Sequence, residues 1–282
     1  MIPYTLTCDE IREDFESHGI DYSRPGFYNH PNFLAIEKDN PGFLNNYARF
    51  VQCQEYSNDY LQHAEAVIRE AVQVVSDEIK KDGRLGACID ASGSFEQMLV
   101  REGIWSYQPK GSLSINFPVL SKIAPSYFYS IVAPQENGPL AGHSWLVAPP
   151  FNVVDLTVKL QQHNSGEGHY LPDYVLQKDI RPTEVYATEV CSPASYVYFG
   201  ASKQIKYFHF NVSPQLKDMF KTFPANLVVL ENKTRLKYIP TAFMAYDDSL
   251  ENNKAFCPNG RSAISVYEDL VRPALIKKGI AK

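Results

Sequence analysis

The strongest structural signal in the sequence is a long amphipathic helix followed closely by a second helix. Residues 57–82 place apolar side chains at helical spacing and charged side chains on the opposite face. Either Ser57 or Asn58 can cap the first turn. The second helix is predicted to begin at Cys88 and to end just before Gly103, which suits the left-handed residue after a last turn. We expect the two helices to pack side by side.

Cys88 stands at the predicted start of the second helix, two residues after a glycine. The unpaired N–H groups and the peptide dipoles of a helix N-terminus lower the pKa of a thiol placed there. A nucleophilic thiolate needs a base, and the base needs an acid that fixes its tautomer. His143 and Asp155 follow in that order. Taken singly, each residue has a structural alternative: a buried free cysteine, a core histidine or a strand-end aspartate.

Antiparallel strands are predicted to follow the second helix. The segments that alternate or run apolar between Pro and Gly residues are 113–117, 127–133, 142–148 and 152–158. The turn at 148–152 predicts a hairpin that would place His143 and Asp155 on neighbouring strands. We expect the Cys88 helix to pack against this sheet.

The order of these motifs resembles the transglutaminase-like superfamily, a branch of the papain-like cysteine enzymes. The family reads Gly-x-Cys, an apolar helix ending in Gly-Ile, then His-x-Trp and Asp-x-Thr. The matching residues here are Cys88, Gly103-Ile104, His143-Ser-Trp145 and Asp155-Leu-Thr157. The resemblance implies an α+β fold with a papain-like, transglutaminase-like core over residues 57–160, in which a nucleophile helix packs on an antiparallel sheet. It also implies a catalytic triad of Cys88, His143 and Asp155.

The absence of features found in two other branches narrows the resemblance. The chain is too short for the extra β-sandwich domains of the large calcium-dependent transglutaminases, and it has no paired C-x-x-C zinc ligands like those of the peptide N-glycanase relatives. What remains resembles the compact microbial members, which act as proteases, amidases, deamidases or effectors. The resemblance therefore implies a cysteine hydrolase or acyltransferase (protease, deamidase or transglutaminase type) that works through a thioester acyl-enzyme and needs no cofactor.

Two questions about the site stay open at the level of sequence. The backbone N–H of Cys88 is the expected first oxyanion donor, and Gln52 or Gln54 is a candidate for the second. Asp90, in the first turn, suits either helix capping or a substrate contact. The alternative function is a non-catalytic protein-binding module on the same fold.

The rest of the chain is predicted to flank this core. Residues 1–56 read as an ordered, aromatic-rich arm with a short helix at 8–18. Residues 161–282 read as a β-rich extension of the same domain or as a subdomain. Its predicted strands are 184–190, 196–199, 205–211, 226–230 and 235–239, and its predicted helices are 213–223 and 262–277.

Composition bears on partners and compartment. The net charge of −5, with no long Lys/Arg cluster, argues against nucleic acid and favours a protein or peptide substrate. Five scattered cysteines without a C-x-x-C pair argue against a zinc site and suit a reducing compartment. His163 and His169 are interpreted as surface histidines rather than metal ligands.

With no signal-peptide pattern and no apolar run of membrane-spanning length, we expect a cytoplasmic protein, with leaderless secretion left open. The sequence does not indicate an oligomeric state.

Overall fold

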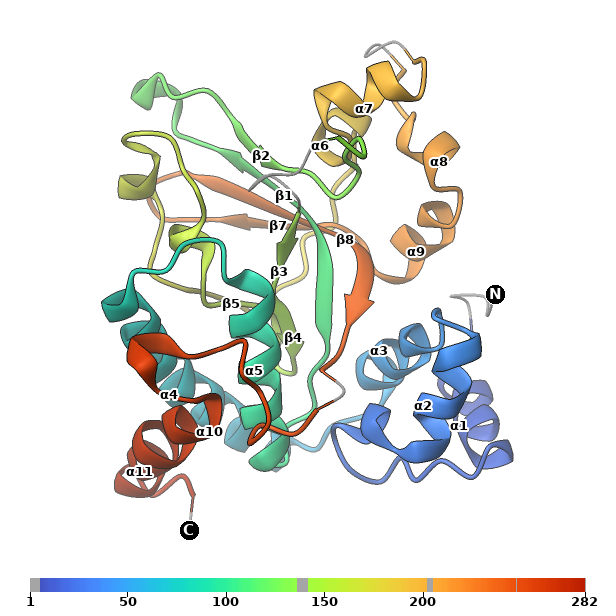
Figure 1. Cartoon of the computed structure of the whole chain (residues 1–282), viewed down its shortest axis with the longest axis vertical. Helices are drawn as coiled ribbons and strands as arrows, with labels where there is room; N and C mark the ends of the chain where they lie inside the picture. The colour runs from blue at the N-terminus through green and yellow to red at the C-terminus, as the bar shows by residue number, and fades with distance from the viewer. Residues whose placement is uncertain (1–5, 136–141, 202–204, 247, 282) are drawn as a thin grey trace.

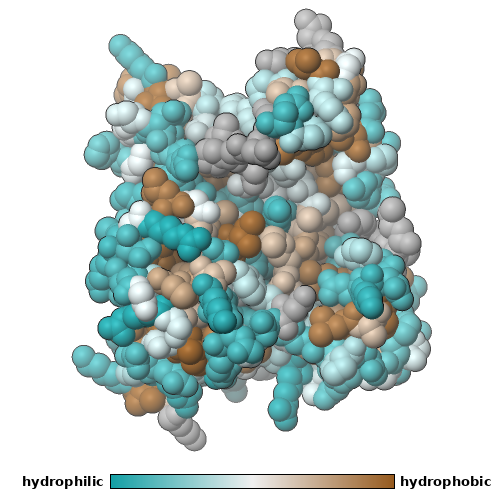
Figure 2. All heavy atoms as spheres, viewed as in Figure 1, coloured by the Kyte–Doolittle hydropathy of each residue, from teal (hydrophilic) through white to brown (hydrophobic). Residues whose placement is uncertain are grey.

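The structure is a computed structural model that describes residues 6–135, 142–201, 205–246 and 248–281. Residues 1–5, for which no signal peptide is expected, lie outside this range. The described chain is mixed α+β, as expected, with helices surrounding antiparallel sheets (Figure 1). None of the described helices combines the length and hydrophobicity needed to cross a bilayer. On the face shown in Figure 2, hydrophobic residues form separate small patches among hydrophilic ones.

The larger sheet runs through the centre of the molecule in the order β2-β1-β8-β7, and β3 also pairs with β1. Its strands are β1 (Gln108–Asn116), β2 (Ser126–Phe128), β3 (His143–Ser144), β7 (Asn226–Val229) and β8 (Arg235–Met244). A smaller sheet contains β4 (Leu146–Ala148), β5 (Phe151–Asp155) and β6 (Val175–Gln177). All the pairings are antiparallel.

The predicted strand 142–148 is divided between the two sheets. Its first part, β3, pairs with β1, and its second part, β4, forms the expected hairpin with β5. His143 therefore does not pair with Asp155 in one ladder, because the two residues belong to different sheets. Their side chains instead approach each other from two different sheets.

The helix pair is confirmed by α4 (Asn58–Asp82) and α5 (Cys88–Arg101). The Ser57 hydroxyl accepts the Tyr60 N–H at 3.2 Å, which settles the choice of cap. Gly83 ends α4 in the left-handed conformation, and Gly103 has φ +73° just after α5. Local conformation thus explains where α4 begins and where both helices end.

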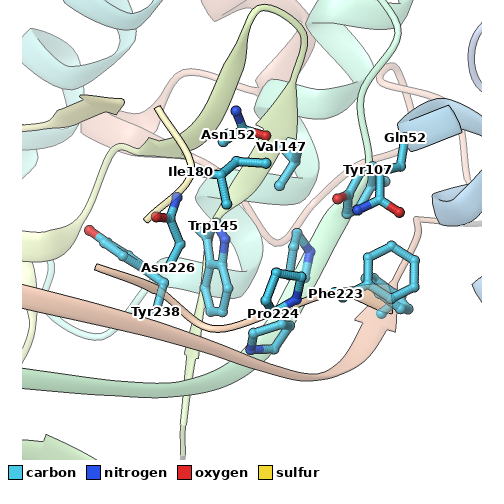
Figure 3. A pocket seen from close by; sticks show the side chains of 13 residues that line it. Gln52, Tyr107, Trp145, Val147, Asn152, Ile180, Phe223, Pro224, Asn226 and Tyr238 are labelled. Carbon is cyan, nitrogen blue, oxygen red and sulfur yellow. The ribbon is translucent and has the colours of Figure 1, made fainter. Parts of the chain in front are cut away.

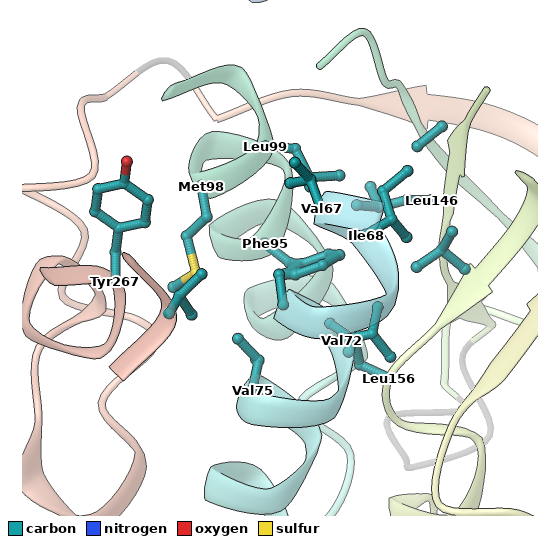
Figure 4. Close-up of a cluster of buried hydrophobic side chains, with 14 of the residues drawn as sticks. Val67, Ile68, Val72, Val75, Phe95, Met98, Leu99, Leu146, Leu156 and Tyr267 are labelled. Carbon is teal, nitrogen blue, oxygen red and sulfur yellow. The ribbon is translucent and has the colours of Figure 1, made fainter. Parts of the chain in front are cut away.

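The main apolar core lies between these two helices and the smaller sheet (Figure 4). Phe95 of α5 packs with Val72 of α4 and with Leu146 of β4, and all three are fully buried. Burying each such side chain stabilises the fold by about 1.5–3 kcal/mol. The last two helices, α10 (Ala263–Val266) and α11 (Arg272–Lys277), join the same core and match the predicted helix 262–277. This core fixes the direction of α5 and therefore the position of Cys88.

The N-terminal arm is helical, and its aromatic core continues into residues 216–225 and Ile239 of β8. Its helices are α1 (Cys8–Ser17), α2 (Pro31–Asp39) and α3 (Leu44–Cys53). Phe15 lies at the centre and contacts the rings of Phe27, Phe43 and Phe50 at centroid distances of 5.0–6.0 Å. The predicted helix 8–18 is confirmed by α1.

A disulfide joins Cys8 to Cys53, whose Cα atoms are 5.8 Å apart. Cys88, Cys191 and Cys257 are free. The two residues are 45 positions apart in sequence, and only the packing of α1 against α3 brings them together. Disulfides persist mainly in oxidising compartments, so this bond does not fit the reducing compartment that the sequence led us to expect.

Removing this disulfide is expected to destabilise the arm. For a loop of this length, the constraint that the disulfide places on the unfolded chain stabilises the fold by about 4 kcal/mol at most. We therefore expect the double variant Cys8→Ala, Cys53→Ala to unfold at a lower urea concentration than wild type. Cys257→Ala, which removes an exposed free thiol, is the matched control. Equal unfolding midpoints for the double variant and the control would contradict the prediction.

Residues 161–282 contain more helix than strand, in contrast to the predicted β-rich extension. The predicted strands at 184–190, 196–199 and 205–211 were wrong, because these regions contain α6 (Ala187–Val190), α7 (Pro193–Tyr198) and α8 (His209–Val212). A short apolar run can form either a strand or a helix. In α7 the N-terminal cap favours the helix: the Ser192 hydroxyl accepts the Ser195 N–H at 3.1 Å, and proline occupies the first helical position. The other predictions are confirmed by α9 (Leu216–Thr222), β7 and β8. Since β8 pairs along the whole of β1, this part of the chain completes the central sheet.

Candidate active site

Three elements bring the three candidate residues together. Cys88 is the first residue of α5, His143 the first of β3 and Asp155 the last of β5. His143 Nε2 lies 2.7 Å from Asp155 Oδ2. The exposed fractions are 7 % for Cys88, 1 % for His143 and 0 % for Asp155. A polar cluster buried this deeply needs a compensating network, and the His143–Asp155 pair is its centre.

His143 is oriented so that its second ring nitrogen is left for the cysteine. Because Nε2 is taken by Asp155, Nδ1 is the remaining nitrogen, and it has no aligned hydrogen-bond partner among the described residues. Burial alone would raise the pKa of the Cys88 thiol, but interaction with His143 and the Ser144 backbone N–H outweighs burial and lowers that pKa. The thiolate is therefore favoured at Cys88.

The same interactions favour the charged form of His143. Burial would lower the pKa of the imidazole, but the adjacent Asp155 carboxylate outweighs burial and raises that pKa to about 10. Burial also opposes ionisation of Asp155, yet its interaction with His143 leaves the pKa of the carboxyl below its usual range. The three shifts together favour a thiolate, an imidazolium and a carboxylate, which is the charge state of an activated cysteine nucleophile.

Two further groups hold the Asp155 carboxylate in place. The backbone N–H of Thr157 donates to Oδ1 at 2.9 Å, and the Thr157 hydroxyl lies 3.4 Å from the same oxygen. The Tyr238 hydroxyl donates to Oδ2 at 2.9 Å. Tyr238 lies in β8, far along the chain, so no local sequence signal could have identified it. Its role depends entirely on the pairing of β8 with β1.

Replacing Tyr238 with phenylalanine is expected to weaken the triad without unfolding the protein. The variant leaves a buried carboxylate with one hydrogen bond fewer, a loss of about 1–3 kcal/mol. We therefore expect Asp155 to become easier to protonate and the pH midpoint for alkylation of Cys88 to rise. Tyr174→Phe, which removes a hydroxyl bonded to Gln73 near the surface, is the control. The same midpoint in Tyr238→Phe and in wild type would contradict the prediction.

The strand that carries His143 approaches β1 through two glycines. Gly111 pairs with His143, and a Cβ atom at Gly111 would lie 1.8 Å from the Ile239 carbonyl oxygen. Gly142 has φ +76°, and a Cβ atom there would lie 2.9 Å from the Gly111 carbonyl oxygen. The position of His143 therefore depends on the small size of both residues.

The remaining site predictions had mixed outcomes. Asp90 lies in the first turn of α5, but its carboxylate contacts Arg84 at 2.8 Å and the Tyr246 hydroxyl at 3.1 Å. The amide nitrogens of Gln52 and Gln54 are committed elsewhere, to the Thr222 carbonyl at 2.9 Å and the Tyr56 hydroxyl at 2.8 Å. Neither glutamine is therefore placed to donate to an oxyanion. In contrast, no side chain caps the start of α5, which leaves its first N–H groups available.

The two histidines interpreted as surface residues differ from each other. His169 is exposed, but the His163 side chain is only 6 % exposed, and its Nε2 lies 2.7 Å from the Val158 carbonyl oxygen. Its assignment as a surface residue was wrong. Among the described residues, no group of three or more His, Cys, Asp or Glu side chains is arranged to hold a metal ion.

Comparisons with protein-family models, with curated proteins and with solved structures found no match for this chain. The chemistry of the site must therefore be inferred from its geometry. That geometry consists of a helix-start cysteine, a histidine facing it, and an aspartate that orients the histidine.

Proposed function

We propose that this chain is a cysteine-dependent amide hydrolase or acyltransferase in which Cys88, His143 and Asp155 form the catalytic triad. The observation that carries the proposal is the convergence of these three buried polar residues from separate elements, with His143 bonded to Asp155 at 2.7 Å. The lowered pKa of Cys88 beside the raised pKa of His143 supports the proposal, because perturbed pKa values of this kind cluster at functional sites. We also propose that α5, packed against the antiparallel sheets, corresponds to the nucleophile helix of a transglutaminase-like core.

The reaction begins with attack of the Cys88 thiolate on the carbonyl carbon of an amide. A C–S bond forms, and the carbonyl electrons move onto the oxygen, which is stabilised by the backbone N–H of Cys88. His143 then donates its proton to the amide nitrogen, the C–N bond breaks and a thioester remains. Water or an amine, deprotonated by His143, attacks the thioester and releases Cys88 as the thiolate. Asp155 keeps the imidazole oriented throughout.

The proposal is tested by searching for products that depend on Cys88. Wild type and Cys88→Ala are incubated with a peptide library containing glutamine and asparagine, with a primary amine present, and the mixtures are analysed by mass spectrometry. Cleavage, deamidation and amine incorporation each give a distinct mass change. An acyl group trapped on Cys88 after acid quenching identifies the intermediate directly.

Cys191→Ala is the matched control, because it removes another buried free cysteine. Products expected in wild type and in this control should be absent from Cys88→Ala. Identical product patterns in wild type and Cys88→Ala would instead favour a protein-binding module that shares the fold.

A further inference from the structure

Gln108 is a fully buried glutamine at the start of β1. Its neighbours Tyr107 and Pro109 line a small pocket together with Trp145 (Figure 3). Successive side chains of a strand point to opposite faces, so Gln108 points away from this pocket, and so does Ser144, the neighbour of Trp145. The side chains of Gln108 and Ser144 meet on that other face, at 2.8 Å.

The Gln108 amide joins three elements. Its nitrogen, Nε2, donates to the Ile89 carbonyl in the first turn of α5 at 3.2 Å and to the Ser144 hydroxyl in β3 at 2.8 Å. Gln108 thus ties β1 to the helix that begins with Cys88 and to the strand that begins with His143. Both N–H groups of the amide are used, so any effect of Gln108 on the reaction must pass through the residues that it holds.

Ser144 is the residue that carries such an effect to the thiol. Its hydroxyl donates to the Pro109 carbonyl at 3.0 Å, and its own carbonyl accepts from the Ser92 hydroxyl of α5 at 3.3 Å. Burial opposes ionisation of Cys88, whereas His143 and the backbone N–H of Ser144 lower the pKa of its thiol. The contact between that N–H and the sulfur depends on how β3 is held against α5.

The carbonyl oxygen of the Gln108 amide destabilises the fold. The Ile89 carbonyl can only accept, so Nε2 must face it, and this orientation leaves Oε1 buried without a hydrogen-bond partner among the described residues. A methionine of similar size would avoid this cost. Both partners would keep other bonds, since Ile89 lies inside a helix and Ser144 still donates to Pro109. Stability therefore does not explain why a glutamine occupies this position.

We propose that Gln108 is a positioning residue for the reaction of Cys88, which holds the first turn of α5 against β3. The inference rests on the proposed function. Through its two bonds, Gln108 keeps the Ser144 backbone N–H directed at the thiolate. Neither bond goes to His143 or Asp155, so loss of the amide leaves that pair in place.

The test measures the rate at which iodoacetamide alkylates Cys88 over a range of pH, by mass spectrometry on digested protein. In Gln108→Met we expect the pH midpoint to rise and the rate at pH 6 to fall at least about threefold, because a hydrogen bond to the thiolate is weakened. The urea midpoint should stay near that of wild type, since the unpartnered oxygen is removed with the amide. Ser144→Ala breaks the same contact from the other side and should raise the pH midpoint similarly, which keeps the test decisive if Gln108→Met does not fold.

Ser112→Ala is the matched control. Ser112 is fully buried in the same strand, and its hydroxyl bonds to that of Ser130 at 2.9 Å, so the variant loses a hydrogen bond that reaches neither α5 nor β3. Its pH midpoint should equal that of wild type, whatever its stability in urea. If Gln108 and Ser144 act through one contact, the double variant Gln108→Met, Ser144→Ala should shift the midpoint no further than either single variant.

Three outcomes would overturn the inference. Wild-type midpoints in Gln108→Met and Ser144→Ala, beside a raised midpoint in His143→Ala, would remove the positioning role and leave the proposed function intact. Additive shifts in the double variant would show that the two residues act separately. An unchanged midpoint in His143→Ala would instead overturn the proposed function, and this inference with it.

Discussion

At pH 6, iodoacetamide is expected to alkylate Cys88 at least about ten times faster in wild type than in His143→Ala. The thiolate is the reactive form, and a thiol with a pKa near 8.5 is ionised to only about 0.3 % at this pH. In wild type, His143 and the Ser144 N–H lower the Cys88 pKa, so the thiolate persists as the pH falls until that lowered pKa is reached. In His143→Ala, burial is no longer outweighed by the imidazole and raises the pKa. A thiolate of lower pKa is intrinsically less nucleophilic, and this offsets part of the increase in alkylation rate that comes from its larger population.

The rate is read by mass spectrometry on digested protein over a range of pH, which also gives the midpoint for each variant. Cys257 provides an internal control, because it is free and exposed and should react at the same rate in both proteins. A Cys88 that reacts like Cys257, whether or not His143 is present, would contradict the activated pair. Such a result would favour the binding-module alternative.

Gly111→Ala is expected to destabilise the protein by at least about 3 kcal/mol or to prevent folding. A Cβ atom at this position would lie 1.8 Å from the Ile239 carbonyl oxygen and 2.8 Å from its carbon, both of them backbone atoms. The clash can be relieved only if β1 and β8 separate, and these two strands form the longest pairing in the central sheet. Overpacking that forces backbone movement costs about 1–3 kcal/mol or more, and here it would also break ladder hydrogen bonds.

Urea unfolding followed by circular dichroism measures this effect. Gly168→Ala is the matched control, since its backbone does not require a positive φ and a Cβ atom would meet nothing within 4 Å. We expect the control to unfold near the wild-type midpoint and Gly111→Ala to unfold at much lower urea concentration or to be unfolded without urea. Similar midpoints for the two variants would show that β1 and β8 tolerate the extra methyl group.

Features set by neighbouring residues could be predicted from the sequence. The apolar spacing of 57–82 and a capping residue at Ser57 or Asn58 predicted α4 because helix formation depends on contacts within one or two turns. The start of α5 at Cys88 followed from the same kind of signal. The order of Cys88, His143 and Asp155 also indicated which side chains to examine, since the required chemistry restricts the choice of residue types.

Features set by distant residues could not be predicted. The capped helix α7 replaced a predicted strand, because a four-residue apolar run fits either structure until its neighbours are known. The Cys8–Cys53 bond likewise required α1 and α3 to be packed together.

The sequence by itself determined the two helices at the centre of the fold and the identity of the three candidate catalytic residues. Only the tertiary structure decided that His143 and Asp155 meet across two sheets rather than within one hairpin. It also decided that Tyr238 holds Asp155 and that Gln52 turns toward Thr222. The physical reason is that helical periodicity and capping act over a few residues, whereas these contacts join residues that are brought together only when β8 and the arm pack against the core.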